Sequence, residues 1–236
     1  VPIVAFLGGD LATQRDQFLR VNNTRPLPRR LITELLPEVD TQLPRRLAAR
    51  KLPSAICDLL NRHPRSPFKD IISRPSNRGP GKKPSIVNDT AMVEMVKDRI
   101  NKPGGCLFPL RNMATNETDT EAVMHLLISY WSAVKETFPE AWGLPPTRSR
   151  LMHGAGIQAM GGLMDHIMGR VNPTSDTLQV HAAEELARIA SICRWTSGHW
   201  EGLGDMHWKD IQNTPKSVRL LTNHLTRAYN LALHSG

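Results

Sequence analysis

Residues 116–138 carry the most regular helical pattern in the chain, and they decide what kind of core it can build. Their apolar side chains recur at three- and four-residue spacing, which places them in one wide stripe along a helix. Thr118 and Glu121 have the spacing of a capping box, so we expect the helix to begin there. The pattern therefore predicts a buried helix at the centre of a helical domain. The stripe consists of Val123, Leu126, Leu127, Tyr130, Trp131 and Val134.

Four further helices are predicted around this one, over residues 89–100, 148–169, 176–194 and 216–233, each with apolar residues at helical spacing. Asp89 or Thr90 is the expected N-cap of the first, and Asp176 is the expected N-cap of the third. Together with the central helix they predict an all-helical domain over residues 86–236.

The helix predicted over residues 148–169 is unusual because it contains Gly154, Gly156, Gly161 and Gly162. A glycine inside a helix costs about 1 kcal/mol relative to alanine, so another interaction must compensate for it. We favour close packing against a bulky neighbouring helix. A phosphate-binding loop is the alternative, but no strand precedes these glycines and no Gly-Lys-Ser or Gly-Lys-Thr follows them.

The first part of the chain has a different pattern. Residues 3–7 form an apolar run that ends at two glycines, which is typical of a buried strand. Helices are predicted over residues 11–21 and 28–36, and a third from Pro44 to Asn61, which Pro53 should kink or end. Residues 62–85 hold five prolines and two glycines, so they predict a basic linker with at most a brief strand at Ile71 and Ile72.

Two segments carry a resemblance to a known family. The segment from Phe18 to Pro28 has the pattern Phe-x-x-Val-Asn-x-Thr-Arg-x-Leu-Pro, and a second segment runs from Trp208 to Lys216 and on to Tyr229. The first resembles the region just downstream of the signature motif in DGQHR-domain proteins. That family includes the B component of DNA phosphorothioation gene clusters.

The resemblance implies a ParB/sulfiredoxin-like α/β domain followed by helices. The chain would then be mainly α, with residues 1–61 forming the end of the ParB-like domain and its basic helices, residues 62–85 a linker, and residues 86–236 the helical domain. The Asp-Gly-Gln-His-Arg motif itself is absent, and Val1 is not an initiator methionine, so we expect a piece of a longer protein. Asn22, Asn23 and Arg25 would line the cleft beside the missing motif, or they simply make the turn.

Charge is distributed unevenly along the chain. Residues 1–83 contain 16 Lys or Arg and 7 Asp or Glu, whereas residues 84–236 contain 14 and 15. A basic segment of this kind favours a polyanionic partner, because cations near phosphates release condensed counterions. A solubilising surface and a face for an acidic partner remain open as alternatives. The predicted phosphate contacts are Arg29, Arg30, Arg45, Arg46, Arg50, Lys51, Arg78, Lys82 and Lys83.

Residues 195–215 concentrate tryptophan and histidine. His199 and His207 lie near one aspartate, but their spacing matches no known ligand set, so the sequence predicts no metal and no cofactor. Trp200 and Trp208 either pack in the core or stack on unpaired bases. The three cysteines are far apart and odd in number, which is typical of a reducing compartment.

These observations predict a DNA-binding, regulatory protein of a bacterial DNA-modification or defence system, with DNA and other DNA-modification proteins as partners. Two alternatives remain. One is a nucleotide-hydrolysing or DNA-nicking enzyme whose cleft lies mostly upstream, in which case these residues should show no turnover. The other is a scaffold that binds an acidic protein. The sequence has no run of about 18 apolar residues and no signal peptide, so a cytoplasmic protein without membrane contact is expected.

Overall fold

The computed structural model describes residues 10, 14, 45–74, 85–112, 115 and 117–234, with side chains of the first helix described from residue 48 onward. This part of the chain is mainly helical, which confirms the predicted fold class. The predicted strand over residues 3–7 and the helices over 11–21 and 28–36 lie outside it. Its helices are α3 (Arg45–Arg62), α4 (Asp89–Asn101), α5 (Thr120–Thr137), α6 (Gly154–Met168), α7 (Leu178–Ala190) and α8 (Pro215–His234).

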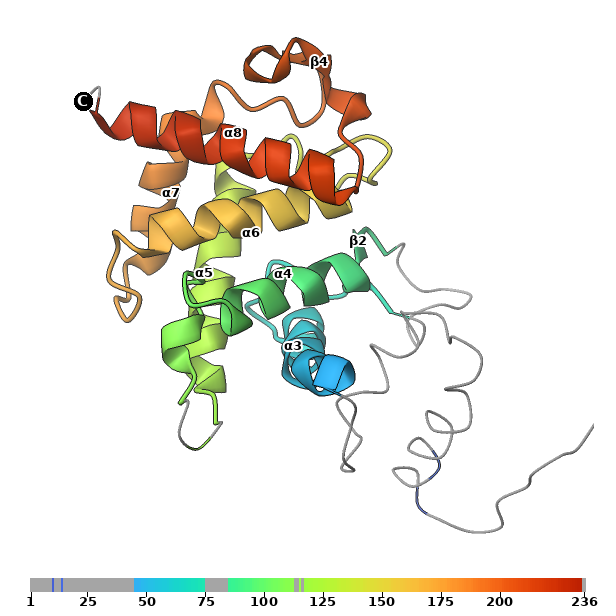
Figure 1. Ribbon diagram of the computed structural model, residues 1–236, viewed down its shortest axis with the longest axis vertical. Helices are drawn as coiled ribbons and strands as arrows, with labels where there is room; N and C mark the ends of the chain where they lie inside the picture. The colour runs from blue at the N-terminus through green and yellow to red at the C-terminus, as the bar shows by residue number, and fades with distance from the viewer. Residues whose placement is uncertain are drawn as a thin grey trace, which may run out of the picture.

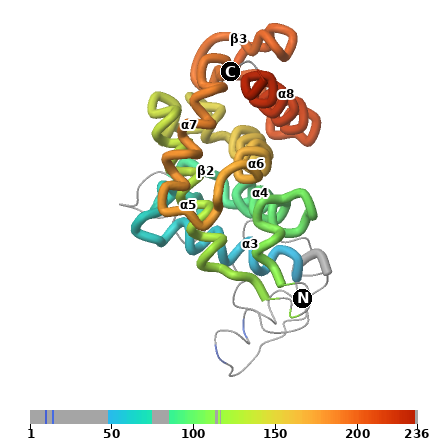
Figure 2. Tube along the Cα trace, turned by 90° about the vertical axis from the view of Figure 1, so that its left-hand side faces the viewer, coloured from blue at the N-terminus to red at the C-terminus, as the bar shows by residue number. Residues whose placement is uncertain are grey.

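The helices pack in a stack that Figure 1 shows from the side, with α3, α4, α6 and α8 following one another upward. The closest helix pairs are α3 with α4, α4 with α6, and α6 with α8, while α5 and α7 pack together behind them. Figure 2 shows the same arrangement turned by 90°. Consequently α6 lies between α4 and α8, and its surface decides how closely those two helices approach.

Strands are very short. β1 (Ile72–Ser73) pairs in parallel with β2 (Val87–Asn88), and β3 (His199–Trp200) pairs in antiparallel with β4 (Met206–His207). The brief strand predicted around Ile72 is therefore present. Single turns of 3-10 helix are η4 (Phe108–Leu110), η5 (Glu201–Leu203) and η6 (Trp208–Asp210).

Helix α5 is the centre of the core, as its apolar stripe predicts. All six predicted stripe residues are 1 % exposed or less. Trp131 meets the Phe68 ring edge-on, with the ring centroids 5.1 Å apart. The Tyr130 hydroxyl donates a hydrogen bond to the Met160 carbonyl of α6 at 2.8 Å. The cap differs from the prediction, because Asp119 accepts the hydrogen bond from the Ala122 amide at 2.9 Å.

The other predicted caps are also displaced by one residue. Asn88, and not Asp89 or Thr90, is the N-cap of α4, and its side chain accepts from the Thr90 amide at 2.9 Å. Thr177, and not Asp176, precedes α7 and makes no capping hydrogen bond with its side chain. Side chains of the same chemical type stand next to each other at both ends, so the sequence alone cannot choose between them.

Gly161 and Gly162 confirm the packing interpretation, whereas Gly154 and Gly156 approach Asn213 and the backbone of residues 150 and 151. A Cβ added at Gly161 would overlap Met95 of α4, and one added at Gly162 would overlap Thr222 of α8. Glycine therefore lets both neighbouring helices approach α6 more closely than any other residue would. The close contact offsets the intrinsic cost of glycine in a helix.

Helix α3 continues through Pro53 without ending. Its buried residues Ile56, Cys57 and Leu60 belong to the same hydrophobic core as α4 and α5. Helix α3, which was expected to belong to the unit of residues 1–61, thus shares a core with the helices after residue 86. The division into residues 1–61, 62–85 and 86–236 stays a prediction, since most of residues 1–44 and all of residues 75–84 lie outside the described part.

Candidate nucleic-acid interface

The predicted phosphate-binding cations fall into two groups, namely those on α3 and those outside the described residues. Arg45 and Arg46 form the first turn of α3, and Arg50 and Lys51 follow in its second turn. The remaining predicted contacts and the cleft candidates lie outside the described residues. These are Arg29, Arg30, Arg78, Lys82, Lys83, Asn22, Asn23 and Arg25.

Arg50 is engaged with a carboxylate. Its guanidinium forms an ion pair with Glu94 of α4, and Glu94 also pairs with Lys97. The Arg50 side chain is 16 % exposed and that of Glu94 is 27 % exposed. Because its charge is already matched by Glu94, Arg50 holds α3 against α4, and a phosphate would have to replace that carboxylate.

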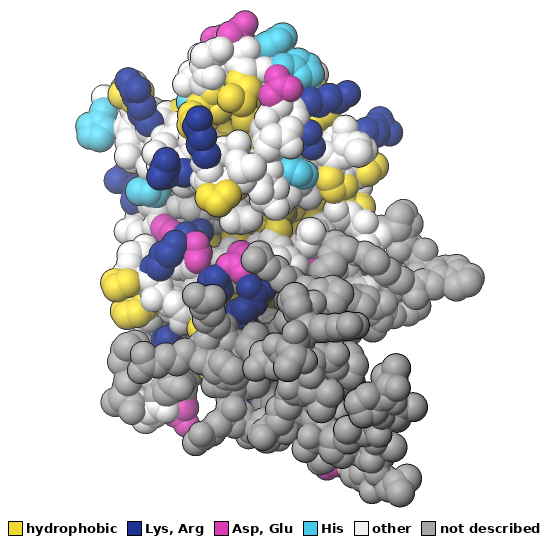
Figure 3. Space-filling model, turned by 45° about the vertical axis from the view of Figure 1, so that its right-hand side comes forward, with side chains coloured by type: hydrophobic (Ala, Val, Ile, Leu, Met, Phe, Trp, Pro, Cys, Tyr) yellow, Lys and Arg dark blue, Asp and Glu magenta, His cyan; other side chains and the backbone are white. Residues whose placement is uncertain are grey.

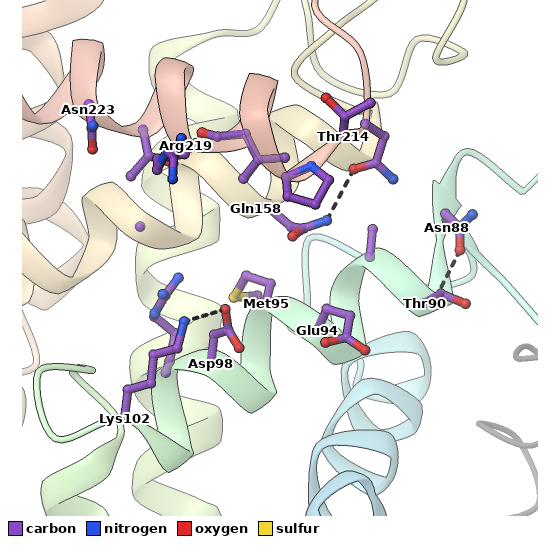
Figure 4. A pocket seen from close by; sticks show the side chains of 17 residues that line it. Asn88, Thr90, Glu94, Met95, Asp98, Lys102, Gln158, Thr214, Arg219 and Asn223 are labelled. Atoms are coloured by element: carbon purple, nitrogen blue, oxygen red, sulfur yellow. Dashed lines mark hydrogen bonds and ion pairs between the residues drawn. The ribbon is translucent and has the colours of Figure 1, made fainter. Parts of the chain in front are cut away.

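A groove of about 600 Å³ opens beside this ion pair, between α4 on one side and α6 and α8 on the other. Figure 4 shows Glu94 and Asp98 on the α4 wall and Arg219 on the α8 wall. We call it the α4–α8 groove. Its volume is in the range of small-molecule sites, and its walls hold side chains of opposite charge.

Amide side chains line the α4–α8 groove at several positions. Gln158 Nε2 donates to Asn213 Oδ1 at 3.2 Å, and Asn88 and Asn223 lie on the same lining. Amide groups both donate and accept hydrogen bonds, so these side chains can bind polar ligands without a net charge. On the α4 wall, Lys102 Nζ donates to Asp98 Oδ2 at 2.8 Å.

Arg99, which also lines the groove, joins a polar cluster between α4 and α6. Its Nε lies 2.8 Å from Asp165 Oδ2, and Asp165 Oδ1 accepts from the Cys106 amide at 2.9 Å. Burial raises the pKa of the Asp165 carboxyl above its ordinary value, although the Arg99 charge acts in the opposite direction. The cluster ties α4 and the segment that follows it to α6, which is a structural role.

The tryptophans of residues 195–211 are core residues. Trp195, Trp200 and Trp208 are 2 %, 0 % and 6 % exposed, and Trp195 meets Trp200 edge-on at 5.1 Å. A ring this deeply buried has no face for a base, so the base-stacking hypothesis for Trp200 and Trp208 is wrong for this arrangement. Packing against other rings accounts for these side chains instead.

The histidines of the β3–β4 hairpin lie close together without forming a ligand set. The rings of His199 and His207 are 5.1 Å apart. Throughout the part of the chain that the structure describes, no group of three or more His, Cys, Asp or Glu residues is placed to hold a metal ion. Burial raises the pKa of the Cys57 thiol to about 12, so that cysteine stays protonated and packs as an apolar residue.

Sequence reasoning missed the cations of α8. Lys216, Arg219 and Arg227 lie in a segment whose regional net charge is close to zero, and that average concealed them. The signal was nevertheless present, because residues 215–234 contain no Asp or Glu. Counting charge helix by helix would have found it.

Comparison with known proteins gives one family. A family model described as DndB, DNA-sulfur modification-associated, matches residues 1–232. No curated protein and no solved structure matches the chain. The match agrees with the expected phosphorothioation-related family, while the resemblance to DGQHR-domain proteins and the ParB-like domain stay predictions. None of the helices described is both long and apolar enough to cross a membrane.

Proposed function

The chain belongs to the DndB family of DNA-sulfur modification-associated proteins, and we propose that within such a system it binds DNA through the phosphate backbone. The observation that carries the proposal is the separation of charge, with 16 Lys or Arg against 7 Asp or Glu in residues 1–83. Phosphate binding by such a segment gains free energy from counterion release and needs no particular base sequence. A regulatory role and contacts with other proteins of the system are part of the same proposal.

The proposed phosphate contacts start at the N-terminal end of α3. Arg45 and Arg46 occupy its first turn. Lys51 follows on α3, and the cations at 29, 30, 78, 82 and 83 would extend the surface. Arg50 contributes least, because Glu94 already neutralises it. These contacts position the protein on DNA and do not read the bases.

Duplex-DNA affinity across a salt series tests the proposal, with single-stranded DNA measured alongside. We expect the logarithm of the association constant to fall steeply with the logarithm of the salt concentration, by about 0.9 for each phosphate contact on duplex DNA. Absence of binding at low salt would overturn the proposal. In that case the basic segment meets an acidic protein instead.

A pair of charge-reversal variants locates the contact. Arg45→Glu with Arg46→Glu should weaken binding to all duplex sequences alike and make the salt dependence shallower. The matched control is Lys135→Glu with Arg148→Glu, which reverses two exposed cations outside the basic segment. Equal losses in both variants would show that net charge, and not the first turn of α3, determines the affinity.

A further inference from the structure

Helix α8 differs from every other helix in its charge. Among the α-helices that the structure describes, it alone contains neither Asp nor Glu, although it is 20 residues long. It carries Lys216, Arg219 and Arg227, together with two histidines. A surface helix normally mixes both signs of charge, so a helix with one sign only indicates an anionic partner.

The buried side of α8 fixes which residues face outward. Leu221, Leu225 and Tyr229 recur every four residues and are fully buried against the rest of the core. Arg219 and Arg227 recur at the same spacing, with Asn223 between them, and all three are exposed. Eight residues of helix rise by about 12 Å, so the two guanidiniums form the ends of a straight polar ridge.

The ridge borders two hollows that meet at Thr222 and Asn223. Arg219 lines the α4–α8 groove, and Arg227 lines a second, more open hollow of about 560 Å³ that also includes His166 and Asn230. Asparagine side chains supply neutral hydrogen-bond donors next to the cations. Side chains of this kind supply many of the contacts to phosphate and sugar in nucleic-acid complexes.

The α8 cations have no carboxylate partner within the described part of the chain. Ion pairs there engage Arg50, Arg99 and Arg188, but none includes Lys216, Arg219 or Arg227. Across the α4–α8 groove, Glu94 and Asp98 already have cationic partners of their own. Figure 3 shows Lys and Arg side chains spread over the upper, described part of this face, with Asp and Glu at its top and lower down.

We propose that the exposed ridge of α8 is a second phosphate-binding surface, separate from the basic segment at residues 1–83, and that its ligand is a nucleic-acid backbone. The inference rests on the proposed DNA-binding function and adds a contact from the helical body. Unpaired cations lose no ion pair when they bind a phosphate, whereas Arg50 must give up Glu94. The ridge is therefore better suited to phosphate than the cations of α3 that pack on α4.

The test uses the whole chain with Lys216→Gln, Arg219→Gln and Arg227→Gln combined. The control variant combines Lys135→Gln, Arg148→Gln and Arg170→Gln, which removes the same charge from exposed positions outside α8 and outside the basic segment at residues 1–83. Duplex-DNA affinity is measured for both across a salt series, and circular dichroism verifies that each is folded. We expect the α8 variant to reduce the salt slope by up to about 2.7 and to lose at least about tenfold in affinity at low salt, since each duplex phosphate contact contributes about 0.9 to the slope.

Each outcome decides between the two proposals. An α8 variant that binds like the unmodified chain would overturn the α8 surface and leave the proposed DNA binding intact. A control variant that loses as much as the α8 variant would also overturn it, because net charge would then explain the effect. If the unmodified chain does not bind DNA at low salt, the proposed function fails, and the α8 proposal fails with it.

Discussion

The cations of α3 and α4 and the cations of α8 belong to the same chain but are arranged in opposite ways. On α3 and α4, Arg50 and Arg99 are each matched by a carboxylate and lie largely buried. On α8, Arg219 and Arg227 are exposed, and no ion pair among the described residues includes them. The same side chain thus holds helices together in one region and remains available to a ligand in the other.

This contrast shows that the ion pairs of each cation indicate its availability to a ligand better than the net charge of its region does. Residues 84–236 are almost neutral in total, yet they include a helix without a single acidic side chain. Conversely, part of the basic excess in residues 1–83 is used inside the protein. Arg74, for example, is 2 % exposed and donates to the Ser54 carbonyl at 2.9 Å.

The largest expected loss of stability comes from substituting Arg99, the most buried paired cation of α4. Arg99→Ala removes the partner of Asp165 and should lower the free energy of unfolding by about 3 kcal/mol, near the lower end for breaking a buried pair, because both side chains keep some exposure. Urea denaturation measures the loss. Lys102→Ala, which breaks the exposed pair with Asp98, is the control and should cost less than about 1 kcal/mol. Equal losses would remove the distinction between the structural cation of α4 and the surface cation at its C-terminal end.

The next largest expected loss of stability concerns the packing of α6, the helix that lies between α4 and α8. Gly161→Ala places a methyl group against Met95 of α4, and overpacking of this kind should cost about 1 to 3 kcal/mol. The thermal midpoint measures it. Gly169→Ala at the C-cap of the same helix is the control, since the added methyl group meets no atom closer than 3.4 Å and the backbone there is already helical. A Gly161→Ala variant as stable as the unmodified chain would show that α4 can retreat from α6.

Smaller changes in stability and in DNA binding are expected when one cation of α3 is compared with one cation of α8. Arg50→Gln should lower the free energy of unfolding by about 1 kcal/mol, because it breaks a half-buried ion pair, and should change DNA binding little. Arg219→Gln should leave stability nearly unchanged and reduce the salt slope of duplex binding by about 0.9. The two variants carry the same chemical change, so each serves as the control for the other. Reversed results would contradict the assignment of structural and binding roles.

The fold was largely predictable because helical periodicity is local. The stripe from Val123 to Val134, the glycine packing of α6 and the apolar face of α8 all follow from spacing within one segment. The exact caps did not follow, since Asn88 and Asp119 compete with neighbours of equal capping ability. The sequence left open whether Pro53 kinks or ends α3; the helix continues through it, because tertiary packing of Ile56 and Leu60 outweighs the local penalty.

The candidate site was less predictable because it depends on contacts between distant segments. Nothing in the sequence near Arg50 shows that Glu94, 44 residues later, neutralises it. Likewise, the tryptophans near Lys209 and the histidines have the composition of a base-stacking surface, and only the three-dimensional arrangement shows that they are buried. Residue type predicted the class of chemistry, whereas exposure and pairing decide which residues are available for it.

The smallest expected effect is a pH dependence at His224, the histidine of α8 that faces inward. Its ring meets Trp200 edge-on at 5.8 Å, and burial, together with the nearby Arg227 charge, lowers its pKa below the ordinary 6.5. The unfolded chain therefore binds a proton more readily than the folded chain, so this group contributes stability above pH 6.5 that is lost as the pH falls through its folded pKa.

His224→Gln should remove this part of the pH dependence, because glutamine does not titrate. Urea midpoints of both proteins at several pH values between 5 and 8 measure the difference, and His234→Gln, at an exposed position of the same helix, is the control. The unmodified chain should lose more stability on acidification than the His224 variant does. If stability depends on pH in the same way in both proteins, the His224 ring is in contact with water in the folded chain. The inner face of α8 would then be packed less tightly than the structure shows.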